Sequence, residues 1–177
     1  MLSDAQVQEF EEAGFVVVDD VFTPAEVDDL RVACAQSGVV DGLGLAGHEE
    51  RIVHLLEITT RHSAFHALCS DPRLVDAVTR LIGPDLQLQH SKLTTKPPVQ
   101  GQGSFKWHQD FAYFPHTNTD LVAVMVMLDD ATPDNGCMSM VEGSHQWGLV
   151  SHSVDGEFQG VCQEPDRWAD PAKIAQI

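Results

Sequence analysis

The hydrophobic pattern of the chain changes its period at Gly83-Pro84. Upstream of this turn, apolar residues recur at the three- and four-residue spacing of helices. Downstream, over residues 86–91, they alternate with polar residues as in a half-buried strand. Helices followed by short strands predict an α+β fold whose strands form a sheet sandwich or barrel. With 177 residues the chain can bury one core, so we expect a single domain, helical over 1–84 and strand-built over 85–177.

Three helices are predicted from signals at their ends. Ser3 and Gln6 have the spacing of a capping box, and Gly14 is placed to stop the first helix. Thr23-Pro24 and Asp71-Pro72 each combine an N-cap residue with a proline at the first helical position. The expected helices are residues 3–13, 24–37 and 72–82.

Strands are expected where short apolar or β-branched runs lie between turn signals. Residues 38–50 hold four glycines and indicate a loop, while Asn135-Gly136 indicates a tight turn. The expected strands are residues 15–18, 86–90, 121–128 and 137–141. Residues 173–177 have the pattern of the beginning of a further strand.

The composition is that of a globular protein, with 43% hydrophobic and 21% charged residues. The formal net charge of -17 disfavours nucleic-acid binding and, more weakly, a polyanionic substrate such as a coenzyme A ester. No apolar run is long enough to span a bilayer. The amino terminus is polar and acidic, so we expect a cytoplasmic protein with no signal peptide and no membrane association.

Two features that could bind zinc are weak. The four cysteines form no CxxC pair, which favours free thiols over a zinc ribbon or a disulfide framework. His62 and His66 are four apart on a possible helix, but no third ligand or glutamate is placed as in a zinc protease.

The densest group of chemically capable residues lies at 107–114. His108 and Asp110 are two positions apart, so on an extended chain their side chains point to the same face. An imidazole and a carboxylate on one face can hold a divalent metal ion. With one further histidine they would form the facial triad that suits non-heme iron(II). The alternative is a partly exposed polar pair beside a turn, and the His-x-Asp pattern by itself does not separate the two.

Several motifs occur in the order and spacing of a known enzyme family. They are Gly14-Phe15-Val16-Val17, Gly83-Pro84, Lys96-Pro97-Pro98, Trp107-His108-Gln109-Asp110, Tyr113-Phe114-Pro115, Leu128-Asp129-Asp130, Asn135-Gly136-Cys137 and Gly143-Ser144-His145. Each motif is weak alone. Together they resemble the phytanoyl-CoA dioxygenase family of iron(II)- and 2-oxoglutarate-dependent oxygenases over nearly the whole chain.

The resemblance implies a double-stranded β-helix, a cupin-like jelly roll, wrapped by N-terminal helices. It implies hydroxylation of a small organic substrate with iron(II), 2-oxoglutarate and dioxygen, and release of succinate and carbon dioxide. His108 and Asp110 are carried over as catalytic iron ligands, and Lys92 and His54 as residues near the 2-oxoglutarate pocket. Asp110 favours hydroxylation over halogenation, because related halogenases have a small residue there that leaves room for chloride.

These assignments have purely structural alternatives. Lys92 can be a strand lysine that extends its amine to solvent. Gly143-Ser144-His145 can be a simple turn. The aromatic residues near the motif can pack the core instead of lining a substrate pocket. These aromatic residues are Trp107, Phe111, Tyr113 and Phe114.

The family's second iron histidine and its 2-oxoglutarate arginine lie well after the Gly-Ser-His motif. The sequence has no histidine after His152, and Arg167 is its only arginine after Asp110. We therefore expect a C-terminally truncated domain, or else half of a split protein or a degenerate homologue. A third ligand from His116, His145 or His152 is less expected. A jelly roll without its closing strands exposes sheet edges, so aggregation or a homo-oligomer is expected.

Two other functions stay open on the sequence. The chain could be a non-catalytic jelly-roll module that binds a small molecule or another chain. It could also be a metal-dependent enzyme of another type, such as a cupin isomerase. Dependence on 2-oxoglutarate distinguishes the oxygenase from both.

Overall fold

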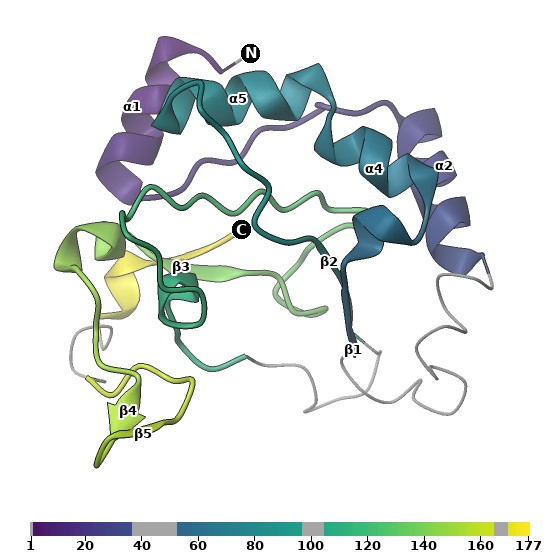
Figure 1. Cartoon of the computed structure of the whole chain (residues 1–177). Helices are drawn as coiled ribbons and strands as arrows, with labels where there is room; N and C mark the ends of the chain where they lie inside the picture. Colours follow the sequence, from purple (N-terminus) through teal and green to yellow (C-terminus); the bar gives the residue numbers. More distant parts are fainter. Residues whose placement is uncertain (1, 37–52, 97–104, 165–169) are drawn as a thin grey trace. The chain divides into compact units, whose positions relative to one another are not determined.

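The computed structural model describes residues 2–36, 53–96, 105–164 and 170–177 (Figure 1). The chain divides into two compact units that interleave along the sequence. The first consists of Val18–Gly103 with Val124–Gly136, and the second of Leu2–Val17, Ser104–Ala123 and Cys137–Ile177. The expected loop at 38–50, the Pro97-Pro98 pair and Arg167 lie outside the described residues.

The first unit packs helices against a two-stranded sheet. Its elements in chain order are α2 (Pro24–Ala35), β1 (Val53–Leu56), the 3₁₀ helix η2 (Ile58–Thr60), α4 (Ser63–Cys69), α5 (Pro72–Ile82) and β2 (Lys92–Thr95). Its core is made of the buried side chains of Leu30, Ala33, Leu55, Ile58 and Phe65. Apolar burial of this kind is the main source of stability, and Phe65 and Leu55 are each only 2% exposed.

Strands β1 and β2 pair antiparallel, with Leu55 opposite Leu93 and Leu56 opposite Lys92. Leu55 and Leu93 pack on the helical core, while Leu56 is 54% exposed. Because strand residues alternate between faces, Lys92 lies on the face turned away from that core. The expected strand at residues 86–90 is wrong. That segment is irregular, and the strand begins at Lys92, where the backbone finds its partner in β1.

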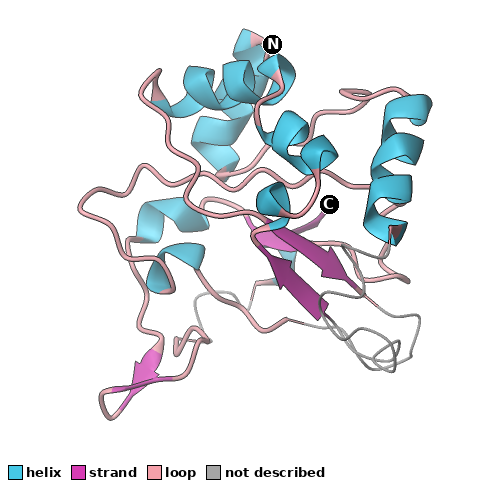
Figure 2. Ribbon diagram, turned by 45° about the vertical axis from the view of Figure 1, so that its right-hand side comes forward, coloured by secondary structure: helices cyan, strands magenta, loops and turns pink. Residues whose placement is uncertain are grey.

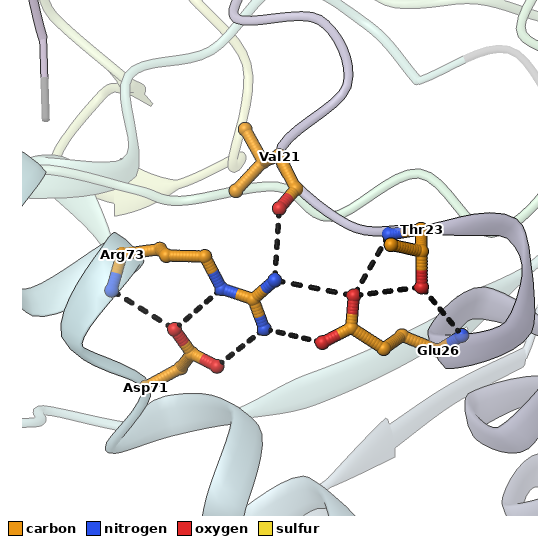
Figure 3. Close-up of polar contacts among 5 residues, drawn as sticks. All are labelled: Val21, Thr23, Glu26, Asp71 and Arg73. Carbon is orange, nitrogen blue, oxygen red and sulfur yellow. Dashed lines mark hydrogen bonds and ion pairs between the residues drawn. The ribbon is translucent and has the colours of Figure 1, made fainter.

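Arg73 ties the starts of α2 and α5 together (Figure 3). Its guanidinium donates to both carboxylate oxygens of Glu26, at 2.7 and 3.2 Å, and to both of Asp71, at 2.9 and 2.7 Å. It also donates to the carbonyl of Val21 at 3.0 Å and lies 4.3 Å from the ring centroid of Phe22. Planar pairing with two carboxylates is a geometry that arginine provides and lysine does not.

The second unit begins with helix α1 and holds the remaining strands. Its elements in chain order are α1 (Asp4–Ala13), the 3₁₀ helix η3 (Asp110–Ala112), β3 (Ser139–Val141), the 3₁₀ helix η4 (Ser144–Trp147), β4 (Ser153–Val154), β5 (Glu157–Phe158), the 3₁₀ helix η6 (Pro171–Lys173) and β6 (Ile174–Gln176). β3 pairs antiparallel with β6, and β4 pairs antiparallel with β5. The beginning of a strand expected at residues 173–177 is confirmed by β6.

The Gly-Ser-His turn closes the C-terminal end of α1. Gly14 adopts a left-handed conformation with φ of 87°, and its N–H donates to the carbonyl of Phe10. The N–H of Gly143 donates to the carbonyl of Ala13 at 2.8 Å, and Nε2 of His145 lies 3.1 Å from the carbonyl oxygen of Glu11. Carbonyls at a helix end need such partners. The motif therefore forms the expected turn, and His145 makes a hydrogen-bond contact.

The helix predictions are confirmed within one residue at their starts and within two residues at their ends. Ser3 and Thr23 both form complete capping boxes, and Asp71 accepts from the N–H of Arg73. Asn135-Gly136 lies in a turn, and β3 falls within the strand expected at 137–141. These features depend on interactions between residues close in sequence, so they can be predicted from the sequence alone.

Two further strand predictions are wrong. Residues 15–18 and 121–128 run without regular strand structure, and Val124, Met125 and Met127 are each about half exposed, at 51%, 55% and 49%. β-branched and apolar composition allows a strand, but a strand forms only when another strand completes its hydrogen bonds. Neither segment has a ladder partner among the described residues.

The described strands pair two by two into three small antiparallel sheets (Figure 2). The structure therefore has the expected α+β character, while the closed double-stranded β-helix stays an implication of the resemblance. A single domain with its division near residue 84 also stays a prediction. All the α-helices of the described residues end before Gly83.

Three inferences made from the sequence can be compared with the described residues. None of their helices is both long and apolar enough to cross a lipid bilayer. The cysteines are free thiols, as expected. Of the two histidines considered as a zinc pair, His62 caps α4 instead, accepting from the N–H of Ala64 through Nδ1 at 3.1 Å.

Candidate metal and co-substrate site

The second unit brings His108 and Asp110 together. Gln109 between them is extended, with φ of -112° and ψ of 127°, and Asp110 begins η3. An extended residue places its two neighbours on the same side of the chain. Nε2 of His108 consequently lies 3.3 Å from Oδ1 of Asp110, with the side chains 33% and 41% exposed.

The backbone carbonyl of Lys106 sets the orientation of the His108 ring. Nδ1 of His108 lies 2.7 Å from the carbonyl oxygen of Lys106. A carbonyl can only accept, so Nδ1 carries a proton, and Nε2, which faces Asp110, is the ring nitrogen that would bind a metal. Histidine ligands of metals are commonly oriented in this way. The ring of Tyr113 meets that of His108 edge to face, with centroids 5.8 Å apart.

The donor set fits a divalent iron ion. Two ligand atoms at about 2.1 Å from one ion and at right angles to each other are about 3 Å apart, close to the spacing of these two atoms. A neutral imidazole with one carboxylate is the beginning of the facial arrangement favoured by iron(II). Among the residues that the structure describes, no group of three or more His, Cys, Asp or Glu side chains is arranged to hold a metal.

A small, solvent-open hollow of about 90 Å³ adjoins His108 in this unit. Its walls combine two tryptophans, a methionine and two valines with a few polar groups, a mixture typical of small-molecule sites. The residues lining it are Trp107, His108, Gln109, Ser139, Met140, Val141, Ser144, Trp147, Val150 and Cys162.

The side chain of Gln109 joins the His-Gln-Asp motif to the segment after η4. Its Nε2 donates to the carbonyl of Gly148 at 2.9 Å, and its Oε1 accepts from the N–H of Val150 at 2.8 Å. Gln109 was not predicted to have a role of its own. Only the family motif itself could have pointed to it, because its partners lie about forty residues away.

His152 is the second residue whose place the sequence did not predict. It is 4% exposed and uses both ring nitrogens, Nδ1 toward the carbonyl of Val150 at 2.7 Å and Nε2 as acceptor from the N–H of Gln109 at 2.9 Å. Sγ of Cys162 lies 3.5 Å from the same Nε2. Burial raises the pKa of the Cys162 thiol, so this group faces His152 as a neutral weak donor.

The three histidines considered as substitute ligands are therefore engaged elsewhere. His152 binds the backbone around Gln109, and Nε2 of His145 lies beside the end of α1. Nδ1 of His116 contacts the carbonyl of Phe114. None of them joins His108 and Asp110 in a metal-holding group of the described residues.

The two residues expected near 2-oxoglutarate belong to the first unit. Lys92 begins β2 opposite Leu56 and is exposed. His54 pairs through its backbone with Thr94, two register positions from Lys92. The structure thus brings these two residues onto one pair of strands. Their roles stay predictions, as do the ligand roles of His108 and Asp110.

Comparison with known proteins agrees with the sequence motifs. The sequence model of the phytanoyl-CoA dioxygenase (PhyH) family matches residues 10–173. A "probable alpha-ketoglutarate-dependent hypophosphite dioxygenase" of Stutzerimonas stutzeri is 28% identical over 86% of this chain and 58% of its own length. An ectoine dioxygenase of Sphingopyxis alaskensis is 28% identical over 84% of this chain and 52% of its own.

The human peroxisomal phytanoyl-CoA dioxygenase is 25% identical over 81% of this chain and 47% of its own length. The chain thus spans about half the length of the curated relatives it matches. The match of the family model covers nearly the whole of its 177 residues. The chain belongs to the phytanoyl-CoA dioxygenase family.

Proposed function

We propose that this protein is an iron(II)- and 2-oxoglutarate-dependent dioxygenase that hydroxylates a small organic molecule. The observation that carries the proposal is the approach of His108 Nε2 to Asp110 Oδ1 at 3.3 Å, with Nδ1 of His108 held by the Lys106 carbonyl. A pair of donors oriented in this way is prepared for one ion before it arrives. Three relatives that carry dioxygenase names support the same chemistry.

The proposed reaction assigns different roles to different residues of the chain. His108 and Asp110 supply two protein ligands, and a third comes from a part of the protein that the described residues do not include. When bound, iron(II) lets 2-oxoglutarate and dioxygen react to succinate and carbon dioxide with hydroxylation of the substrate. Asp110 keeps one coordination position filled by an oxygen ligand, which favours hydroxylation over halogenation.

Lys92 is proposed to neutralise the distal carboxylate of 2-oxoglutarate, and His54 to contribute to the same pocket. A carboxylate needs a cation or several hydrogen-bond donors when it leaves water, and a lysine ammonium supplies both. The exposed position of Lys92, on the side of β2 away from the helical core, leaves its amine accessible for that purpose. The name of the Stutzerimonas relative specifies alpha-ketoglutarate, which is 2-oxoglutarate.

The substrate is proposed to be a small molecule that enters the hollow beside His108. Trp107, Met140 and Trp147 offer it apolar contact, and Ser139 and Ser144 offer hydroxyl groups. The names of the three relatives refer to substrates as different as hypophosphite, ectoine and phytanoyl-CoA. The net charge of -17 disfavours a coenzyme A ester for this chain.

The test is an anaerobic titration of the protein with iron(II) and 2-oxoglutarate, following the visible charge-transfer band of the chelate. We expect a band that is lost in Asp110→Ala, because the variant removes the carboxylate that lies beside His108 Nε2. The control is Asp120→Ala, which removes an exposed acid from the same unit. A band of equal strength in Asp110→Ala would contradict the proposed ligand.

A second candidate is a non-catalytic binding module. The observation in its favour is that the described residues present two donors and no third. A charge-transfer band with the wild-type protein would favour the oxygenase, whereas the absence of a band is expected both for a binding module and for a domain that lacks its third ligand. Substrate-dependent release of succinate would exclude this second candidate.

A further inference from the structure

The buried ring of His152 contacts the backbone in the middle of the His-Gln-Asp motif. The N–H of Gln109 donates to Nε2 of His152 at 2.9 Å, across 43 positions of sequence. That N–H belongs to the peptide group joining His108 to Gln109. The direction in which it points is therefore coupled to the direction of the His108 side chain.

The tautomer of His152 follows from its contacts. Nδ1 lies 2.7 Å from the carbonyl oxygen of Val150 and must donate, which leaves Nε2 of the neutral ring as an acceptor. An acceptor is what the amide of Gln109 needs, because an unpaired amide in a partly buried place is costly. The two contacts are thus consistent with each other only in this tautomer.

The position of the ring is itself constrained. His152 stacks on Phe158 of β5, with centroids 6.4 Å apart and planes 17° from parallel. Phe158 in turn meets the ring of Tyr113 edge to face at 5.1 Å, and Tyr113 donates to the carbonyl of Gly160 at 2.6 Å. Phe158 of β5 therefore limits how the ring that receives the amide of Gln109 can move on one side.

We propose that His152 is the positioning residue of the His108–Asp110 pair. It holds the peptide between them through Nε2 and thereby sets the two donor atoms at the spacing of one ion before metal binds. The metal-binding part of this inference rests on the proposed function; the hold on the Gln109 amide does not. His152 acts through Gln109 and is not itself a ligand.

The test compares substitutions that separate the two ring nitrogens. His152→Phe keeps a flat ring against Phe158 but has no acceptor. His152→Gln can present an oxygen near the position of Nε2, whereas His152→Asn can present a donor near the position of Nδ1. His66→Phe, at an exposed residue of α4 in the first unit, controls for loss of an imidazole.

Two readouts are measured on each variant of the 177-residue chain. The first is the dissociation constant of Co(II), an air-stable stand-in for iron(II), followed by its visible absorption. The second is the hydrogen-exchange rate of the Gln109 amide, which needs no metal. A circular dichroism melt identifies any variant that does not fold.

We expect His152→Phe and His152→Asn to bind Co(II) roughly 10- to 100-fold more weakly, the usual loss when the partner that orients a ligand is removed. The Gln109 amide should exchange faster in both. His152→Gln should restore both quantities toward wild type, which a merely space-filling role of the ring would not explain.

Unchanged exchange of the Gln109 amide in folded His152→Phe would overturn the inference. So would equal Co(II) affinity in His152→Phe and wild type. If the wild-type protein binds no Co(II) while the amide still exchanges faster in His152→Phe, the proposed function fails and the hold of His152 on the motif stands.

Discussion

A methyl group on Gly14 would collide with the imidazole of His145. The nearest atoms to an added Cβ there are Nδ1 and Cγ of His145, with Cγ at 2.8 Å, and Gly14 has φ of +87°. Helix α1 thus ends against a turn that comes more than a hundred residues later in the chain. Both the conformation and the close approach require glycine at this position.

The first prediction concerns Gly14→Ala. Left-handed strain of about 1–3 kcal/mol and the collision with His145 should together lower the free energy of unfolding, measured by urea denaturation. Gly156→Ala is the matched control, because Gly156 has φ of +83° and nothing within 4 Å of an added Cβ. If both variants lose the same stability, the approach of His145 to Gly14 has no energetic consequence.

A double variant isolates the collision. His145→Ala removes the ring, so Gly14→Ala should cost less in that background than in wild type. The difference between the two costs measures the interaction of the two positions.

The second prediction concerns pH. Hydrogen bonds from Arg73 hold the pKa of both Glu26 and Asp71 down to about 2, with the Thr23 backbone N–H contributing for Glu26. A carboxyl whose pKa is lower in the folded protein contributes stability above its unfolded pKa of about 4 and loses it as pH falls toward 2. Thermal stability of wild type should therefore decline over this interval.

Arg73→Gln should flatten that decline, because both carboxylates then titrate near their ordinary pKa in the folded and unfolded protein. Arg73→Lys should restore only part of it, since one ammonium cannot pair in plane with both acids. The control is Arg80→Gln on the same helix. An equal slope between pH 4 and 2 in wild type and Arg73→Gln would show that the network in Figure 3 does not govern acid stability.

The third prediction concerns Lys92, whose place near 2-oxoglutarate rests on the family resemblance. Lys92→Met keeps the apolar stem and removes the charge, so the affinity for 2-oxoglutarate in the presence of iron(II) should fall roughly tenfold. Equilibrium titration of the chelate band measures it. Lys173→Met, at an exposed lysine in η6, is the control. Equal affinity in Lys92→Met and wild type would identify Lys92 as a strand lysine that only meets solvent.

The parts of the fold that were predictable depend on neighbours in sequence. Ser3 with Gln6 and Thr23 with Glu26 are three residues apart, and each pair forms the capping box that its spacing indicates. Gly14 stops its helix because no other residue takes a left-handed conformation at so little cost. All the residues that form such a feature lie within about one helical turn of each other.

The features that were predicted wrongly or missed depend on partners far away in the sequence. Residues 121–128 have the composition of a strand, but composition does not reveal whether another strand will pair with them. The spacing of His108 and Asp110 was readable because only extended backbone between them was needed. The hydrogen bond from Gln109 to His152 could not be predicted, since no local sequence pattern indicates an interaction across 43 residues.

The contact between α1 and the Gly-Ser-His turn also affects how the protein is made. Glu11 and His145 are 134 positions apart, so the ribosome must add that many residues before the end of α1 can meet its partner. At about 5–20 residues per second this takes roughly 7 to 27 s. During synthesis the C-terminal carbonyls of α1 therefore lack the partners that the Gly-Ser-His turn provides. For that interval a chaperone can bind this end of the helix.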